Sequence, residues 1–298
     1  MSDVYSPQHE KETLSNLSAV YKLQMSDEIF EKLSRFIYSQ YGIKMPMVKK
    51  VMLQSRLQRR LREMKMDSYE QYCDFVFSKE GEAIELVHMI DVVTTNKTDF
   101  FREPAHFDFL RHTVLPEFVA RNKQKTTIKI WSAGCSSGEE VYTLAMVLSD
   151  FMENNRNLDY SILGTDISSR ILQKAFDAVY TEERVSNIPL ELKKKYFLRS
   201  RDRAKPTVRL IPEIRKKASY QRLNFMDDSY HVQEKFDVIF CRNVLIYFDR
   251  DTQQKVINQL CSHLKNGGYF FLGHSESITG MNVPLVQLKP TVFMKIQI

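Results

Sequence analysis

The stretch I-K-I-W-S-A-G-C-S-S-G-E-E at Ile128–Glu140 decides the fold of this 298-residue chain. An apolar strand runs into the small-residue turn Ala133–Gly138, after which Glu139 opens a helix with an apolar face. Strand, glycine turn and helix form the first unit of a doubly wound sheet, in which ligands bind beyond the carboxyl end of the strand. A second predicted strand, Ser161–Thr165, ends in Asp166, which is placed to accept hydrogen bonds from a ribose. The stretch therefore predicts a nucleoside pocket.

The glycine turn does not match the phosphate-binding fingerprints. Neither G-x-G-x-x-G nor G-x-x-x-x-G-K-[ST] is present, and a glycine turn alone could be no more than a tight connection. Two acids, Glu139 and Glu140, begin the helix and would repel a phosphate there. They suit a nucleoside that carries a positive charge and amino or hydroxyl donors, and S-adenosylmethionine fits that description.

The composition indicates a globular protein of one large or two modest domains, with 43% hydrophobic residues. We expect no membrane span, because no apolar run reaches about 18 residues, and no signal segment is recognisable at the N-terminus. The four cysteines are far apart and without a C-x-x-C pair. They are typical of reduced cytoplasmic thiols and predict no metal site.

The net charge of +6 is unevenly distributed. Residues 44–65 carry a net charge of about +7 and residues 191–222 about +9, so the remainder is acidic. Two basic islands on an acidic protein could bind an acidic partner. They could equally be solvated faces.

The predicted organisation has four parts. Residues 1–25 form a flexible tail, residues 26–93 a helical domain, residues 94–105 a linker that contributes to the cofactor site, and residues 106–298 an α/β domain. In the helical domain we expect the second helix to bury an apolar stripe with members Val48, Met52, Leu57, Leu61 and Met64. Basic residues lie largely outside that stripe and are expected to contact an acidic helical surface: Lys49, Arg56, Arg59 and Arg60.

The linker T-T-N-K-T-D-F-F-R-E at Thr94–Glu103 has two interpretations. Its phenylalanines could dock it while its polar residues cap turns. Alternatively, Asn96, Thr98 and Arg102 could fold over the nucleoside pocket as one wall. Nothing in the pattern decides between them.

Strand-like segments at 196–198, 208–210 and 218–223 predict a small antiparallel insert at about 189–222. The parallel pattern resumes with the strand Phe236–Phe240, and two further segments, 285–288 and 292–296, predict a closing hairpin.

Five motifs in order and in register now carry a resemblance: T-T-N-K-T-D-F-F-R-E, W-S-A-G-C-S-S-G-E-E, G-T-D-I, F-D-V-I-F-C-R-N-V-L-I-Y-F at Phe236–Phe248, and G-H-S-E at Gly273–Glu276. From about Ser26 to the C-terminus the chain resembles the CheR family of chemotaxis-receptor glutamate O-methyltransferases. Ser132 and Ser136 depart from the pattern of the broader methyltransferase class, and Val141 stands where a proline commonly follows the paired glutamates. The first two resemble this particular family, and valine is tolerable in a first helical turn.

The resemblance implies an α/β fold: a seven-stranded, mostly parallel S-adenosylmethionine-dependent methyltransferase sheet with an N-terminal all-helical domain and a small antiparallel β insert. It implies S-adenosylmethionine as cofactor, S-adenosylhomocysteine as product, and the helical bundle of a chemoreceptor as partner, so that the enzyme meets the membrane only through the receptor. The cofactor-binding residues that it implies are Asn96, Thr98, Arg102, Gly134, Glu140, Asp166, Asn224, Phe225, Arg242 and Asn243. The resemblance also implies Arg102 and Tyr247 as catalytic residues. The basic residues of the helical domain are implied as contacts with the receptor.

The implied methyl transfer to a glutamate carboxylate requires no general base, because a glutamate with a pKa near ~4.3 is already ionised at neutral pH. Each assignment has a structural alternative: Tyr247 could simply pack, Arg242 could pair with Asp166 or Glu140, and His274 could be a turn residue. No tail tethering to the receptor is expected, since the turn Ser200–Pro206 lacks the glycine of tail-binding members.

Two other functions stay open on the sequence. The same fold could methylate RNA or another protein, although the basic islands lack the interleaved aromatic residues of a base-stacking surface, and we expect no nucleic acid. A cofactor-binding scaffold without catalysis is the other alternative.

Overall fold

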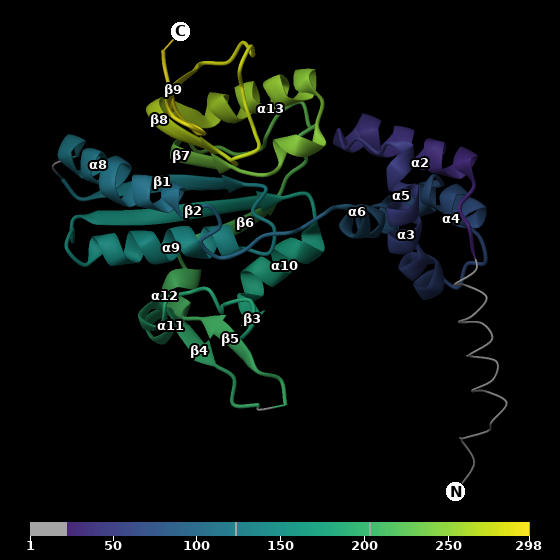
Figure 1. The fold of residues 1–298 in the computed structure, drawn as a ribbon, viewed down its shortest axis with the longest axis horizontal. Helices are drawn as coiled ribbons and strands as arrows, with labels where there is room; N and C mark the ends of the chain where they lie inside the picture. Colours follow the sequence, from purple (N-terminus) through teal and green to yellow (C-terminus); the bar gives the residue numbers. More distant parts are fainter. Residues whose placement is uncertain (1–22, 123, 203, 298) are drawn as a thin grey trace, which may run out of the picture. The chain divides into compact units, whose positions relative to one another are not determined.

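The computed structural model describes residues 23–122, 124–202 and 204–297, and the chain divides into two compact units after Thr95. The first unit is all helical (Figure 1). Its elements are α2 (Asp27–Tyr41), the 3-10 turn η1 (Met47–Lys49), α3 (Lys50–Met64), α4 (Tyr69–Val76), α5 (Lys79–Ile84) and α6 (Leu86–Val93). Ser26 caps α2 through its side chain, and Gly42 ends it at φ 69°. Within the described ranges every helix falls short of the length and apolar character needed to cross a bilayer.

The buried stripe of α3 differs from the prediction. It consists of Leu53, Leu57 and Leu61, whereas Val48 is 86% exposed and Met52 only partly buried. The α-helix begins at Lys50, after the 3-10 turn η1, which has three residues per turn instead of 3.6. Leu57 and Leu61 are buried as predicted. Val48 and Met52 are wrong, because Val48 lies in the 3-10 turn before the helix and Met52 is five residues from Leu57, which places it on another side of the helix.

The second unit contains a seven-stranded sheet with the order β6-β2-β1-β7-β8-β10-β9. The first five strands are parallel to one another, and β10 is antiparallel to both of its neighbours, β8 and β9. This confirms the mostly parallel sheet and the closing hairpin. The strands are β1 (Thr126–Ala133), β2 (Leu158–Asp166), β6 (Ala218–Arg222), β7 (Phe236–Cys241), β8 (Leu264–Leu272), β9 (Leu285–Lys289) and β10 (Val292–Lys295).

Alternate residues of the central strands feed two separate cores. Ile128 and Ile130 of β1 pack on one face with the helices α7 (Ala105–Phe109), α9 (Glu139–Met152) and α10 (Ser169–Asp177). Trp131 packs on the other face with α13 (Arg250–His263). A π-helical turn, η2 (Leu110–Val114), joins α7 to α8 (Leu115–Arg121). The sheet is therefore covered on both sides, and its carboxyl edge is left for a ligand.

The small insert is antiparallel as predicted, but its strands differ from the predicted set. Its sheet has the order β3-β5-β4 (Figure 1). Its strands and helices are β3 (Val179–Thr181), α11 (Leu190–Tyr196), β4 (Phe197–Arg199), β5 (Thr207–Leu210) and α12 (Pro212–Arg215). The segment 218–222, which we predicted to belong to the insert, instead pairs parallel with β2 as the edge strand β6. The predicted range of about 189–222 thus includes β6 and omits β3, because alternation identifies a strand but not its partner.

Candidate active site

The glycine turn after β1 lies at the carboxyl edge of the sheet. Gly134 has φ +86°, and an added Cβ would meet Val244 at 2.3 Å, so only glycine fits. The amides of Gly134 and Cys135 both donate to the carbonyl of Thr165, at 2.7 and 2.8 Å. The turn is therefore anchored to the end of β2.

Asp166 lies at that end of β2. Its carboxylate accepts hydrogen bonds from the amides of Ser136, at 2.9 Å, and Ser168, at 3.0 Å. These bonds hold the carboxylate beside the glycine turn, where the sequence places the acceptor for ribose hydroxyls.

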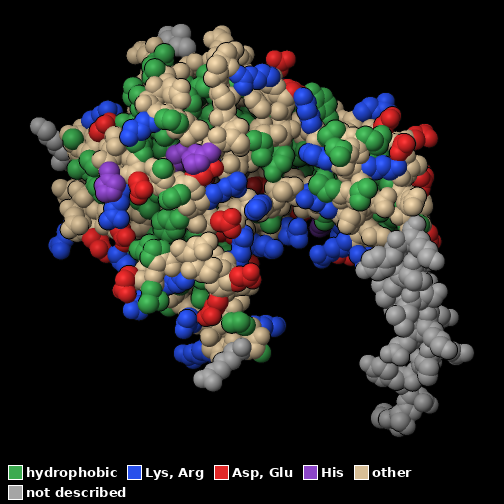
Figure 2. Space-filling view, viewed as in Figure 1, with side chains coloured by type: hydrophobic (Ala, Val, Ile, Leu, Met, Phe, Trp, Pro, Cys, Tyr) green, Lys and Arg blue, Asp and Glu red, His purple; other side chains and the backbone are tan. Residues whose placement is uncertain are grey.

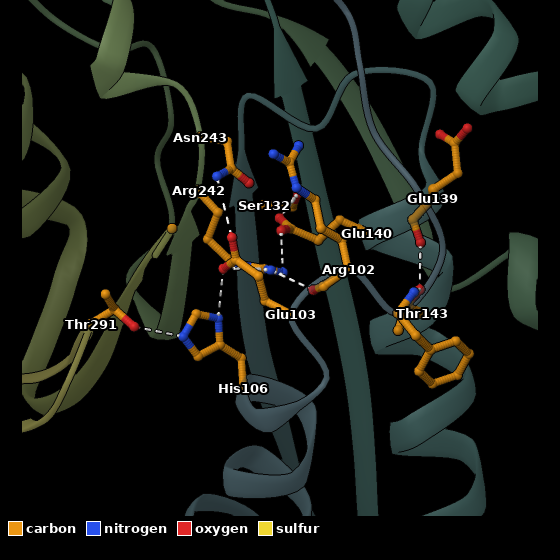
Figure 3. A network of polar contacts seen from close by, with 12 residues as sticks. Arg102, Glu103, His106, Ser132, Glu139, Glu140, Thr143, Arg242, Asn243 and Thr291 are labelled. Carbon is orange, nitrogen blue, oxygen red and sulfur yellow. Dashed lines mark hydrogen bonds and ion pairs between the residues drawn. The ribbon is translucent and has the colours of Figure 1, made fainter. Parts of the chain in front are cut away.

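A buried arginine connects the first helix of the sheet to the linker. The Arg242 side chain is 2% exposed and donates to Glu140 Oε2 at 3.1 Å, to Glu103 Oε2 at 2.9 Å and to the carbonyl of Arg102 (Figure 3). Glu140 Oε1 also accepts from the Ser132 hydroxyl at 2.7 Å. One guanidinium faces two carboxylates, so the group has an excess of negative charge. The sequence left open that Arg242 pairs with Asp166 or with Glu140, and the structure confirms the pair with Glu140.

The ionisation of Glu103 follows from this pairing. Burial by itself would raise its pKa, but the Arg242 guanidinium, with hydrogen bonds from the His274 amide and the Asn243 side chain, holds the pKa of Glu103 below its ordinary value. Glu103 was not among the predicted site residues, although it ends the quoted linker motif. Its carboxylate joins the linker to the loops after β7 and β8.

The loop after β7 is organised by Glu276, which ends the motif G-H-S-E and was not among the predicted site residues. Glu276 Oε1 accepts from the amides of Val244 and Leu245, and Oε2 from those of Asn243 and Gly273, at 2.7–2.9 Å. The side chain is buried, and this burial raises its pKa against the opposing effect of the four amides. The loop leads into the 3-10 turn η3 (Leu245–Tyr247), which presents the half-buried Tyr247.

The docking interpretation of the linker describes part of its geometry. Phe100 docks against Tyr180 and Phe197, with ring centroids 5.0 and 5.8 Å apart. The same linker reaches the glycine turn, where the Ser136 hydroxyl donates to the carbonyl of Asn96 at 3.1 Å. Arg102 donates to the carbonyl of Lys97 at 3.1 Å.

Arg184, which the prediction missed, ties this segment to α9. Its guanidinium donates to the carbonyl of Thr98 at 2.8 Å, to Glu139 at 2.9 Å and to Asp99 at 3.1 Å. Glu139 is 1% exposed, so the arginine compensates a buried carboxylate. A lone arginine in a loop gives no sequence signal for such a role.

The predicted adenine border continues from β6. The Asn224 side chain accepts from the amide of Met226 at 3.1 Å, and Phe225 packs against Tyr230 and Phe248. The amide of Leu223, just before it, donates to the carbonyl of Asp166. This segment is thereby connected to the predicted ribose acceptor.

The basic residues predicted for substrate contact lie in the helical unit and differ among themselves. Arg60 forms a bidentate pair with the buried Glu85, and Arg56 donates to carbonyls at the end of α6. These two side chains stabilise the unit internally. Arg59 is 65% exposed beside Glu63, and Lys49 donates to the carbonyl of Lys44 at 3.3 Å.

Comparisons with known proteins agree with this geometry. The family model described as "CheR methyltransferase, SAM binding domain" matches residues 96–294, and "CheR methyltransferase, all-alpha domain" matches residues 28–94. A chemotaxis protein methyltransferase of Borreliella burgdorferi is 40% identical over 92% of this chain and 96% of its own length. A probable chemotaxis protein methyltransferase of Rhizobium etli is 36% identical over 82% and 90%. A chemotaxis protein methyltransferase of Escherichia coli is 33% identical over 89% of both.

Proposed function

The chain belongs to the CheR methyltransferase family, and on that premise we propose that it transfers a methyl group from S-adenosylmethionine to glutamate side chains of chemoreceptors. The observation that carries the proposal is that all five family motifs contribute to one edge of the sheet. Hydrogen bonds from one motif to the next join the glycine turn, Asp166, the Arg242–Asn243 loop, Glu276 and the Glu103 end of the linker.

The residues at this edge fit the cofactor. S-adenosylmethionine supplies a methyl group on a positively charged sulfur, which leaves as a neutral thioether. Asp166 offers a fixed carboxylate for ribose hydroxyls, and the Gly134 turn allows close backbone approach. Glu103 and Glu140 carry one more charge than Arg242 neutralises, which favours a ligand with a cationic centre. Asn96, Thr98, Asn224, Phe225 and Asn243 complete the proposed cofactor-binding set.

Arg102 and Tyr247 are proposed to orient the incoming glutamate. Arg102 lies between Phe101 and Glu103, whose φ angles of 53° and 57° are left-handed. Non-glycine residues in this region are uncommon and concentrate at functional sites. The carbonyl of Arg102 is held by Arg242, so the strained turn is fixed by the buried network. An acceptor carboxylate that is already ionised needs alignment and removal of water instead of a base.

The receptor surface is proposed on the helical unit. Since Arg56 and Arg60 are engaged within that unit, the contribution to an acidic helical partner falls mainly to Arg59 and Lys49. An exposed charge of this kind affects association rate and salt dependence more than affinity.

The test is transfer of labelled methyl from S-adenosylmethionine to receptor-containing membranes, with base-labile methanol release as the readout. We expect volatile label with the wild type and with the exposed control Lys255→Ala, and little with Asp166→Ala or Arg102→Ala. Asp166→Ala should also lose S-adenosylhomocysteine binding by calorimetry. Cofactor binding without volatile label on any receptor would refute the proposal and favour the RNA, other-protein or scaffold alternatives.

A further inference from the structure

Two histidines lie beside Glu103, outside the proposed methyl-transfer set. One ligand atom each from Glu103, His106 and His274 lies within 4.8 Å of the others. Glu103 Oε2 is 3.5 Å from His106 Nδ1 and 3.9 Å from His274 Nε2. Ligand atoms of a tetrahedral zinc site, each about 2.0–2.2 Å from the metal, are roughly 3.3–3.5 Å apart. The spacing of the three groups is therefore close to that of a metal site.

The tautomer of His106 follows from Thr291. The Thr291 hydroxyl lies 2.7 Å from the carbonyl of Pro290 and 2.8 Å from His106 Nε2 (Figure 3). With its hydrogen assigned to that carbonyl, the hydroxyl accepts from Nε2. A neutral imidazole carries only one hydrogen. That hydrogen lies on Nε2, and Nδ1 is left with a lone pair.

The Nδ1 lone pair of His106 faces another hydrogen-bond acceptor, the carboxylate of Glu103. His106 is 3% exposed, and its buried Nδ1 has no hydrogen-bond partner among the residues that the structure describes. It faces the carboxylate of Glu103 at 3.5 Å with no hydrogen between the two acceptors.

We propose that Glu103, His106 and His274 form a binding site for a divalent transition-metal ion of the Zn²⁺ class. Imidazole nitrogens together with one carboxylate suit zinc, whereas magnesium and calcium prefer oxygen ligands alone. Thr291 serves as the outer partner that fixes the tautomer of a ligating histidine.

Access and consequence both follow from the location. His274 is 60% exposed, and histidine side chains reach the surface of the larger unit in Figure 2, so an ion can enter from solvent. Because Glu103 also binds Arg242, an ion there shares the carboxylate with the arginine that holds Glu140. The site is adjacent to the cofactor edge but does not depend on the proposed function.

The test uses the full chain, freed of metal with a chelator and titrated with Co²⁺, whose visible absorption reports ligation, followed by competition with Zn²⁺. We expect Thr291→Val, which removes the outer partner, to weaken Co²⁺ binding by roughly 10–100-fold. His274→Ala, which removes an exposed ligand, should weaken Co²⁺ binding by more than that. His231→Ala, an exposed histidine of the same unit, is the matched control and should not change it. No Co²⁺ absorption in the wild type, or equal affinity in His274→Ala, would overturn the site, and unchanged affinity in Thr291→Val would overturn the tautomer argument.

Discussion

Replacing Glu276 by glutamine tests whether one carboxylate organises the loop that carries Asn243 and Tyr247. The side chain keeps its size, but one of its two oxygens becomes an NH₂ group. Each oxygen accepts two backbone amides, so in either orientation two amides lose their acceptor and face a donor instead. The two amides lie around a buried side chain, so water cannot readily replace the acceptor that they lose.

The magnitude can be worked from these contacts. A hydrogen bond to a charged group contributes about 1.5–3 kcal/mol, so losing two costs roughly 3–6 kcal/mol. The neutral amide is easier to bury than a carboxylate, as the raised pKa of Glu276 indicates, which offsets part of the loss. We expect the larger unit to be destabilised by about 3–5 kcal/mol. For a unit of this size that corresponds to a fall in Tm of roughly 6–20 °C.

The assay is scanning calorimetry of the full chain, with Glu234→Gln as control. Glu234 is 53% exposed and pairs with Lys129 at the surface, so its substitution should stay within about 0.5 kcal/mol. Titration with S-adenosylhomocysteine would show in parallel whether the loss of these hydrogen bonds from the loop after β7 weakens cofactor binding. A Glu276→Gln transition as high as that of the Glu234→Gln control would refute the account of this loop.

Three further predictions concern the turn, the linker and the buried histidine. Gly134→Ala places a Cβ 2.3 Å from Val244 at φ +86°, so S-adenosylhomocysteine binding should fall by at least tenfold in calorimetry; affinity within twofold of wild type would contradict the fit. Arg184→Met leaves the buried Glu139 uncompensated and should destabilise the larger unit by about 1–3 kcal/mol in denaturant unfolding, whereas Arg199→Met, at an 80% exposed side chain, should change little. His106 has its pKa lowered to about 4 from 6.5, so below pH 6.5 the unfolded chain takes up a proton that the folded chain does not. In metal-free buffer the wild type should therefore lose about 3 kcal/mol between pH 6.5 and pH 4 beyond what His106→Gln loses; parallel pH profiles would show that His106 is not buried in neutral form.

Local patterns in the sequence determined the class of fold and the edge of the sheet at which the motifs meet. The turn at 134–138 requires glycine at its first and last positions, where φ is positive and a Cβ would clash, and the strand ending in Asp166 requires apolar alternation. Both are therefore visible as residue types at fixed spacing. Since the carboxyl ends of parallel strands lie at one edge of a sheet, the order of the motifs was sufficient to bring them together.

Only the tertiary structure decided the partners of these residues. The strand at 218–222 joins β2 and not the insert, because the edge of the main sheet offers it a parallel neighbour that alternation cannot specify. Glu276, Arg184 and the Glu103–His106–Thr291 contacts join residues up to 185 positions apart, and hydrogen-bond direction exists only between groups already placed in space. Sequence chemistry thus determined which groups are available, and packing decided which of them meet.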